Sequence, residues 1–180
     1  GMSFQPDELL EMDTLYTIGF PANRVLALSG TATVPETRWT ISTVPYPALI
    51  GTDPFDGDVN ISLYNGVTFY FASPMNKDTL RERITISPEP WREPSFYYRD
   101  YNNSMTAYFP AEPSTKYIIN FASGAEDLYG HTIDSSRTFT FTTAAYSPSV
   151  NMRTPGTLGF YNAYRDETQL FVTHRNVSRL

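Results

Sequence analysis

The sequence contains no cysteine. This absence excludes a disulfide framework, a thiol nucleophile and a zinc site built on cysteine ligands. It does not fix the cellular compartment, because exported proteins can also lack cysteine.

Basic residues are also scarce. The net charge is −6, only two lysines accompany the eleven arginines, and the arginines do not gather into a block. Such a sequence contains no basic patch of the kind that binds nucleic acid or an anionic membrane surface. No apolar run of about 18 residues occurs, so the sequence predicts no membrane-spanning helix. No signal-peptide pattern is visible either.

The motifs of common enzymes and cofactor sites are missing as well. His131 and His174 are the only histidines, and no His-Glu-x-x-His pair, Gly-x-Ser-x-Gly elbow, phosphate-binding loop or dinucleotide fingerprint occurs. We interpret both histidines as surface or interface residues. Three carboxylates gather in Asp53–Asp58, but their spacing does not match a calcium-binding EF-hand loop, and we interpret the segment as a turn. The sequence therefore predicts no enzyme, no catalytic residue, no cofactor and no metal.

Aromatic residues and turn formers are abundant instead. Phe, Trp and Tyr make up 15% of the chain, beside 14 prolines and 10 glycines, which predicts a turn-rich all-β protein. Apolar residues alternate with threonine and other polar residues in short runs, as in strands with one buried face. A hairpin is expected where Ser95–Tyr98 and Met105–Phe109 flank Asp100–Asn103. The shared phase of the runs predicts these core residues: Phe69, Phe71, Ile84, Ile86, Tyr117, Ile119, Phe121, Phe139 and Phe141.

The chain repeats itself after about 100 residues. Segment 14–20 returns as segment 115–121, 101 positions later, and segment 38–43 returns as segment 138–143, 100 positions later. A period of this length is too long for a solenoid unit and fits one whole β-sandwich domain. The sequence therefore predicts that this chain is a segment of a protein built from tandem β-sandwich units.

Two stretches rich in proline and glycine divide the chain, and each contains a tyrosine at the matching position, Tyr46 or Tyr146. They are Pro45–Gly57 and Ala144–Gly156, and both are typical of linkers. The predicted domains are a partial unit at residues 1–50, which corresponds to the second half of the repeat, a complete β-sandwich at residues 51–146, and the first strands of a following domain at residues 147–180.

The complete unit resembles the bacterial Ig-like domains found in S-layer proteins and other tandem surface arrays. The resemblance implies an Ig-like β-sandwich with a structural, non-catalytic role. It rests on five motifs in the family's order. The first two are an opening strand that ends in a Pro-Met turn, Val67–Met75, and a threonine-containing strand that ends in proline, Leu80–Pro88. The other three are a Pro-x-Thr-x-Tyr strand entry, Pro113–Tyr117, an Asp-x-x-Gly turn, Ala125–Gly130, and a closing Phe-Thr-Thr strand, Phe139–Thr143.

The tail carries a second resemblance. Expected strands at Phe160–Tyr164 and Gln169–Thr173 look like the first strands of a macroglobulin-type domain, which follows Ig-like modules in bacterial alpha-2-macroglobulin-like proteins. This resemblance implies a spacer module within a larger exported protein, in the periplasm, at the cell surface or outside the cell. Its partners are the neighbouring domains of the same polypeptide, and proteases only through the full-length protein. The trapping chemistry, a bait region or a thioester, has no counterpart in this chain.

One aromatic-rich stretch is the candidate interaction surface. It contains Trp91, Tyr97, Tyr98 and Tyr101, and such side chains stack on sugar rings or occupy protein interfaces. An adhesion or carbohydrate-binding module is therefore the alternative function. A glycosidase is a third reading with little to support it, because no acidic pair lies in a recognisable motif.

Each end of the chain is expected to form only part of a β-sandwich unit. The apolar face of the first unit, with Tyr16, Ile18, Phe20, Trp39 and Ile41, has no upstream partner, and the tail begins strands that it does not complete. Uncovered apolar faces and sheet edges attract other strands. We expect the two ends to cover each other, within one chain or in a strand-exchanged dimer.

Overall fold

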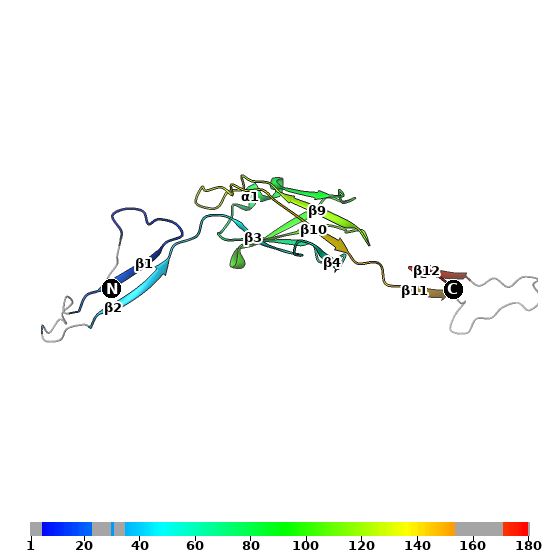
Figure 1. Ribbon diagram of the computed structural model, residues 1–180, viewed down its shortest axis with the longest axis horizontal. Helices are drawn as coiled ribbons and strands as arrows, with labels where there is room; N and C mark the ends of the chain where they lie inside the picture. The colour runs from blue at the N-terminus through cyan, green and yellow to red at the C-terminus, as the bar shows by residue number, and fades with distance from the viewer. Residues whose placement is uncertain (1–4, 23–29, 31–34, 154–170, 180) are drawn as a thin grey trace, which may run out of the picture.

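A computed structural model describes residues 5–22, 30, 35–153 and 171–179. Its centre is a sandwich of two four-stranded sheets, one in the order β3-β5-β8-β7 and the other in the order β4-β10-β9-β6 (Figure 1). All pairings are antiparallel except β4 with β10, which is parallel. The strands of the sandwich are β3 (Leu49–Asp53), β4 (Asp58–Ile61), β5 (Val67–Phe71), β6 (Ile84–Ser87), β7 (Ser95–Arg99), β8 (Ser104–Tyr108), β9 (Lys116–Phe121) and β10 (Arg137–Thr143).

Short helical turns connect some of these strands. α1 (Lys77–Leu80) and η1 (Arg81–Arg83) lead from β5 to β6, and η2 (Asp100–Asn102) closes the hairpin between β7 and β8. The hairpin predicted around residues 100–103 is confirmed, and Asn103 ends its turn in the left-handed region with φ of 48°. Asparagine tolerates this conformation better than most residues. Among the described residues, no helix is long and apolar enough to cross a membrane.

The core lies between the two sheets and follows the predicted alternation. On β5, Val67, Phe69 and Phe71 point inward, while Thr68 and Tyr70 point outward. The predicted core residues are buried, except that Ile84 is only partly buried beside the core. Phe69 lies near the centre, with its ring centroid 5.9 Å from those of both Phe121 and Phe139. The alternation of apolar residues therefore located the face of each strand that is buried.

The segment between the first and second units differs from the prediction. Residues 45–57 were expected to be a linker, but β3 lies within them and pairs with β5. A shift in register between Leu49 and Gly51 places Leu49 and Thr52 on the buried side, so the inward residues are three positions apart. This irregularity removes the alternation of period two by which strands are recognised. β4, which follows directly, was missed as well.

A separate hairpin precedes the sandwich. β1 (Leu15–Phe20) pairs antiparallel with β2 (Thr37–Ser42), with Tyr16 opposite Ile41 and Ile18 opposite Trp39. The pairing repeats that of β9 with β10, where Tyr117 is opposite Phe141 and Ile119 is opposite Phe139. The sequence repeat is thus also a repeat of strand register. The β1–β2 hairpin has the same pairing as the last two strands of the sandwich.

The same set of side-chain hydrogen bonds occurs in the β9–β10 pair and in the β1–β2 hairpin. In the sandwich, the Thr143 hydroxyl donates to the Glu112 carbonyl oxygen at 2.5 Å and accepts from the Thr115 amide at 2.9 Å. The Glu112 amide donates to the hydroxyl oxygen of Tyr117 at 2.9 Å. These bonds tie the segment before β9 to the end of β10.

In the β1–β2 hairpin the corresponding atoms form the same bonds. The Thr43 hydroxyl donates to the Glu11 carbonyl oxygen at 2.7 Å and accepts from the Thr14 amide at 2.9 Å. The Glu11 amide donates to the hydroxyl oxygen of Tyr16 at 2.8 Å. Because side chains of the same type repeat these bonds, the two hairpins share their local structure as well as their register.

A second hairpin follows the sandwich. β11 (Ser149–Arg153) pairs antiparallel with β12 (Phe171–Arg175). The strand expected at Gln169–Thr173 therefore overlaps β12, whereas the one expected at Phe160–Tyr164 lies outside the described residues. The β1–β2 and β11–β12 hairpins form separate two-stranded sheets, at opposite ends of the sandwich in Figure 1. The described parts of the two ends therefore do not cover each other within one chain, and the strand-exchanged dimer stays a prediction.

Candidate functional site

The structure does not place the four predicted interaction residues on one surface: Tyr97 and Tyr98 are neighbours on β7, Trp91 precedes this strand and Tyr101 follows it in η2. Trp91, Tyr97 and Tyr101 are 74%, 60% and 84% exposed. Tyr98 instead turns toward the core, and its hydroxyl oxygen accepts a hydrogen bond from the Met75 amide at 2.9 Å. Burial raises the pKa of the Tyr98 phenol, against the opposing effect of this bond. Tyr98 therefore anchors the loop after β5, and only the other three predicted residues are exposed.

Sequence reasoning missed Arg99, which contacts Tyr97 and Tyr108. Its guanidinium carbon lies 5.2 Å from the ring centroid of Tyr97, within reach of a cation–π contact. Its nitrogens donate to the Thr106 hydroxyl at 2.7 Å and to the Tyr108 hydroxyl at 3.2 Å. The signal was available, since Arg99 follows Tyr97 at the spacing that puts two residues on one face of a strand. Tyr97 and Tyr108 are thereby held on one outer face of the sandwich.

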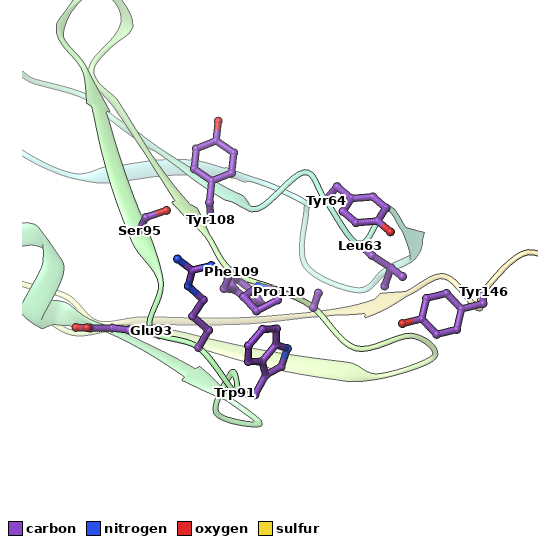
Figure 2. Close-up of a pocket in the computed structure, with 11 residues that line it drawn as sticks. Leu63, Tyr64, Trp91, Glu93, Ser95, Tyr108, Phe109, Pro110 and Tyr146 are labelled. Atoms are coloured by element: carbon purple, nitrogen blue, oxygen red, sulfur yellow. The ribbon is translucent and has the colours of Figure 1, made fainter.

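A shallow aromatic hollow lies at the edge of the sandwich. Its volume is about 550 Å³, and Trp91, Tyr64, Tyr108 and Tyr146 contribute aromatic side chains to its lining (Figure 2). Arg92 and Glu93 add one charge of each sign. Of the predicted surface residues, the hollow includes Trp91 but neither Tyr97 nor Tyr101. Tyr64 and Tyr146 are distant from Trp91 in the sequence, and only the fold brings them together.

Two of the three carboxylates in residues 53–58 accept hydrogen bonds from backbone amides. Asp58 accepts a hydrogen bond from the Phe55 amide at 2.8 Å, and Asp56 accepts one from the Thr140 amide at 2.8 Å. The Asp58 bond lies within the turn before β4, and the Asp56 bond attaches this turn to β10. Within the described ranges, no group of three or more His, Asp or Glu side chains is arranged to hold a metal ion.

The first joint, residues 44–48, connects the β1–β2 hairpin to the sandwich. On the hairpin side, the Val44 carbonyl oxygen accepts from the Asp13 amide at 3.0 Å. On the sandwich side, Pro47 is buried and the Ala48 carbonyl oxygen accepts from the Ala72 amide at 3.0 Å. Between these anchors, the ring of Tyr46 contacts that of His131 edge-on, with centroids 5.5 Å apart.

The second joint, residues 144–148, follows the same plan. The Ala144 carbonyl oxygen accepts from the Ser114 amide at 3.1 Å, as Val44 does one repeat earlier. Tyr146 is again held by the unit that follows it. The Arg175 guanidinium carbon lies 4.8 Å from its ring centroid, and the Asn176 side-chain amide donates to its carbonyl oxygen at 2.7 Å. Tyr146 therefore belongs to the second joint and to the aromatic hollow at once.

The two histidines lie in different settings. His131 contacts Tyr46 of the first joint, and its Nδ1 lies 3.6 Å from Oδ2 of the buried Asp127. The other oxygen of that carboxylate accepts from the Tyr129 and His131 amides, both at 2.8 Å, and so shapes the Asp-x-x-Gly turn. His174 is exposed on β12, opposite Val150 of β11.

Comparison with known families identifies the sandwich. The sequence model of a family described as "Bacterial Ig-like domain" matches residues 44–143, more than half of the chain. The matched span begins at the first joint and ends with β10. The fold is the expected all-β Ig-like sandwich, and members of this family are generally non-catalytic. Comparison with the curated proteins finds no match.

Proposed function

We propose that this chain, which belongs to the bacterial Ig-like domain family, serves as a spacer that holds neighbouring units of a larger protein at restricted angles. Domains of this family occur in bacterial surface proteins as structural modules. The observation that carries the proposal is the construction of the two joints. Each is bonded to the unit before it, and each presents a tyrosine to the unit after it.

Short joints restrict the angle between units because little backbone is free to rotate. In the first joint, only residues 45–47 lie between the hydrogen-bonded Val44 and Ala48 carbonyls. Two of these three residues are prolines, whose φ is fixed near −65°. Pro47 is also buried, so the chain enters β3 in one direction. A linker of this composition is a semi-rigid spacer rather than a flexible tether.

Paired spin labels test the stiffness of the first joint. The chain has no cysteine, so labels attach only at introduced sites, and Thr40→Cys on β2 with Lys116→Cys on β9 places exposed labels on either side of the joint. We expect a narrow distance distribution by pulsed electron resonance. Tyr46→Ala combined with Pro47→Gly is expected to broaden it, because the ring contact and one fixed φ are lost.

The control is Tyr101→Ala, which removes an exposed tyrosine outside both joints and is expected to leave the distribution unchanged. A distribution that is already broad in the unaltered chain would contradict the spacer proposal. So would a distribution that the joint substitutions do not change.

The aromatic hollow supports a second candidate function, the binding of carbohydrate. Five aromatic residues line one open surface, the four named above and Phe109, and aromatic faces stack on sugar rings. Titration of the chain with soluble oligosaccharides, followed by tryptophan fluorescence, tests this alternative. Saturable binding that Trp91→Ala abolishes supports it, and an unchanged signal contradicts it.

For the parent protein we propose an exported bacterial protein with tandem units of this kind, of the S-layer type or, more narrowly, alpha-2-macroglobulin-like. The repeated register of β1–β2 and β9–β10 supports the tandem arrangement. The alpha-2-macroglobulin-like assignment rests on the resemblance of the tail alone. The full-length sequence tests it, because a bait region or thioester segment supports the assignment and the lack of both contradicts it.

A further inference from the structure

The β1–β2 hairpin presents an apolar face that the sandwich buries at the corresponding positions. We name this the head face: Tyr16, Ile18, Phe20, Trp39 and Ile41. Trp39 and Ile41 are 50% and 41% exposed, whereas Phe139 and Phe141 at the same places of the repeat are buried. A cluster of large apolar side chains left in water is a typical feature of a binding surface.

The sandwich shows what covers such a face. Across the core from β9 and β10 lies β5, whose Phe69 ring contacts Phe121 and Phe139. These two rings correspond to Phe20 and Trp39 in the repeat, which contact each other edge-on with centroids 5.6 Å apart. The head face therefore corresponds to the inner face of β9 and β10, which lies across the core from β5. We expect it to bind a pair of antiparallel strands arranged like β3 and β5.

The tail of the chain provides a strand pair of this type. β11 begins 100 residues after β3, and it pairs antiparallel with β12 as β3 does with β5. Met152 opposite Val172 stands where Thr52 stands opposite Phe69.

Val150 shares the face of Met152, because alternate residues of a strand point to the same side. β11 differs here from β3, where a register shift puts Leu49 on the buried side and leaves Ile50 exposed, since the β11–β12 register has no such shift. His174, opposite Val150 and two residues from Val172, lies on this face as well. We name Val150, Met152, Val172 and His174 the tail face, and all four side chains are exposed.

We propose that the head face of one copy of this chain binds the tail face of a second copy. Val172 of the second copy then lies on the Phe20–Trp39 pair, as Phe69 lies on Phe121 and Phe139. A second copy is the occupant because the two hairpins of a single chain form separate sheets at opposite ends of its sandwich (Figure 1). The contact is heterologous, so copies join head to tail.

This inference rests on the equivalence of the strands and not on the stiffness of the joints. A flexible joint would leave the contact possible, and a stiff joint does not create it. The failure of one proposal is therefore distinguishable from the failure of the other.

A complementation experiment by sedimentation velocity tests the contact. Trp39→Asp places a charge in the head face, and Val172→Asp places one in the tail face. The unaltered chain is expected to associate as its concentration rises, and each variant alone is expected to remain monomeric. An equimolar mixture of the two is expected to form a 1:1 dimer, because each variant retains the face that the other has lost.

Matched controls change the opposite sides of the same strands. Thr40→Asp on β2 and Thr173→Asp on β12 are expected to associate like the unaltered chain. A second measurement does not depend on charged variants. In Trp91→Phe, Trp39 is the sole tryptophan, and its emission is expected to shift to shorter wavelength with rising concentration as the contact buries it.

The results that overturn the proposal are specific. An unaltered chain that stays monomeric at all concentrations contradicts it, and would leave the head face to another segment or protein. Association that Val172→Asp does not weaken indicates contact between two head faces and contradicts it as well. A mixture of the two variants that remains monomeric, while Trp39 emission stays constant with concentration, also overturns it.

Discussion

Phe69→Ala is expected to lower the free energy of unfolding of the sandwich by about 3–5 kcal/mol, the range for truncating a buried phenylalanine. Phe69 is fully buried, and its ring contacts aromatic rings of both β9 and β10. The substitution removes the ring contacts of Phe69 with both strands and leaves a cavity between the two sheets. Urea denaturation followed by far-ultraviolet circular dichroism measures the loss.

The matched control is Tyr64→Ala, which truncates an exposed aromatic side chain in the loop before β5. Surface substitutions of this kind usually change stability by less than about 0.5 kcal/mol. A small effect of Phe69→Ala, comparable to that of Tyr64→Ala, would mean that the two sheets do not pack as described.

The second large loss in the free energy of unfolding is expected from Thr143→Val. This substitution removes the hydroxyl that bonds to Glu112 and Thr115, in the segment before β9. Valine has nearly the same shape, but it leaves the Thr115 amide and the Glu112 carbonyl without their bonds to this side chain. Leaving a buried donor unsatisfied costs about 1–3 kcal/mol. The same denaturation experiment is expected to show a loss of this size.

Thr43→Val is the internal control, because Thr43 makes the same bonds in the β1–β2 hairpin. That hairpin is a separate sheet, so this substitution is expected to leave the unfolding of the sandwich unchanged. Equal losses from the two substitutions would show that the hairpin and the sandwich unfold as one cooperative unit.

Much of the sandwich could be predicted from alternation alone. The inward residues of β5 repeat with period two, and the repeat of segment 14–20 as segment 115–121 predicted that the first unit corresponds to the second half of the complete one. The shared strand register of β1–β2 and β9–β10 is a finding of the structure. β3 was missed for a physical reason. Its register shift places Leu49 and Thr52 on one side, and the proline and glycine around it are typical of a linker.

The candidate site was harder to predict because it depends on distant residues. Trp91 was identified from its aromatic neighbours, but the hollow that it lines also needs Tyr64 and Tyr146. No local pattern brings these residues together. Tyr97 and Tyr98 show the limit of reading an aromatic stretch as one surface, since neighbouring residues of a strand point to opposite sides.

The central claim is that one complete Ig-like unit is flanked by hairpins that belong to separate cooperative units. Native-state hydrogen exchange tests it most directly, measured on Val172→Asp so that copies do not associate. Amides of β3, β5, β8, β9 and β10 are expected to exchange only by global unfolding of the sandwich, and those of β1 and β2 are expected to exchange orders of magnitude faster. Equal protection of β1–β2 and β9–β10, or exchange of β3 at the rate of an exposed linker, would contradict the claim.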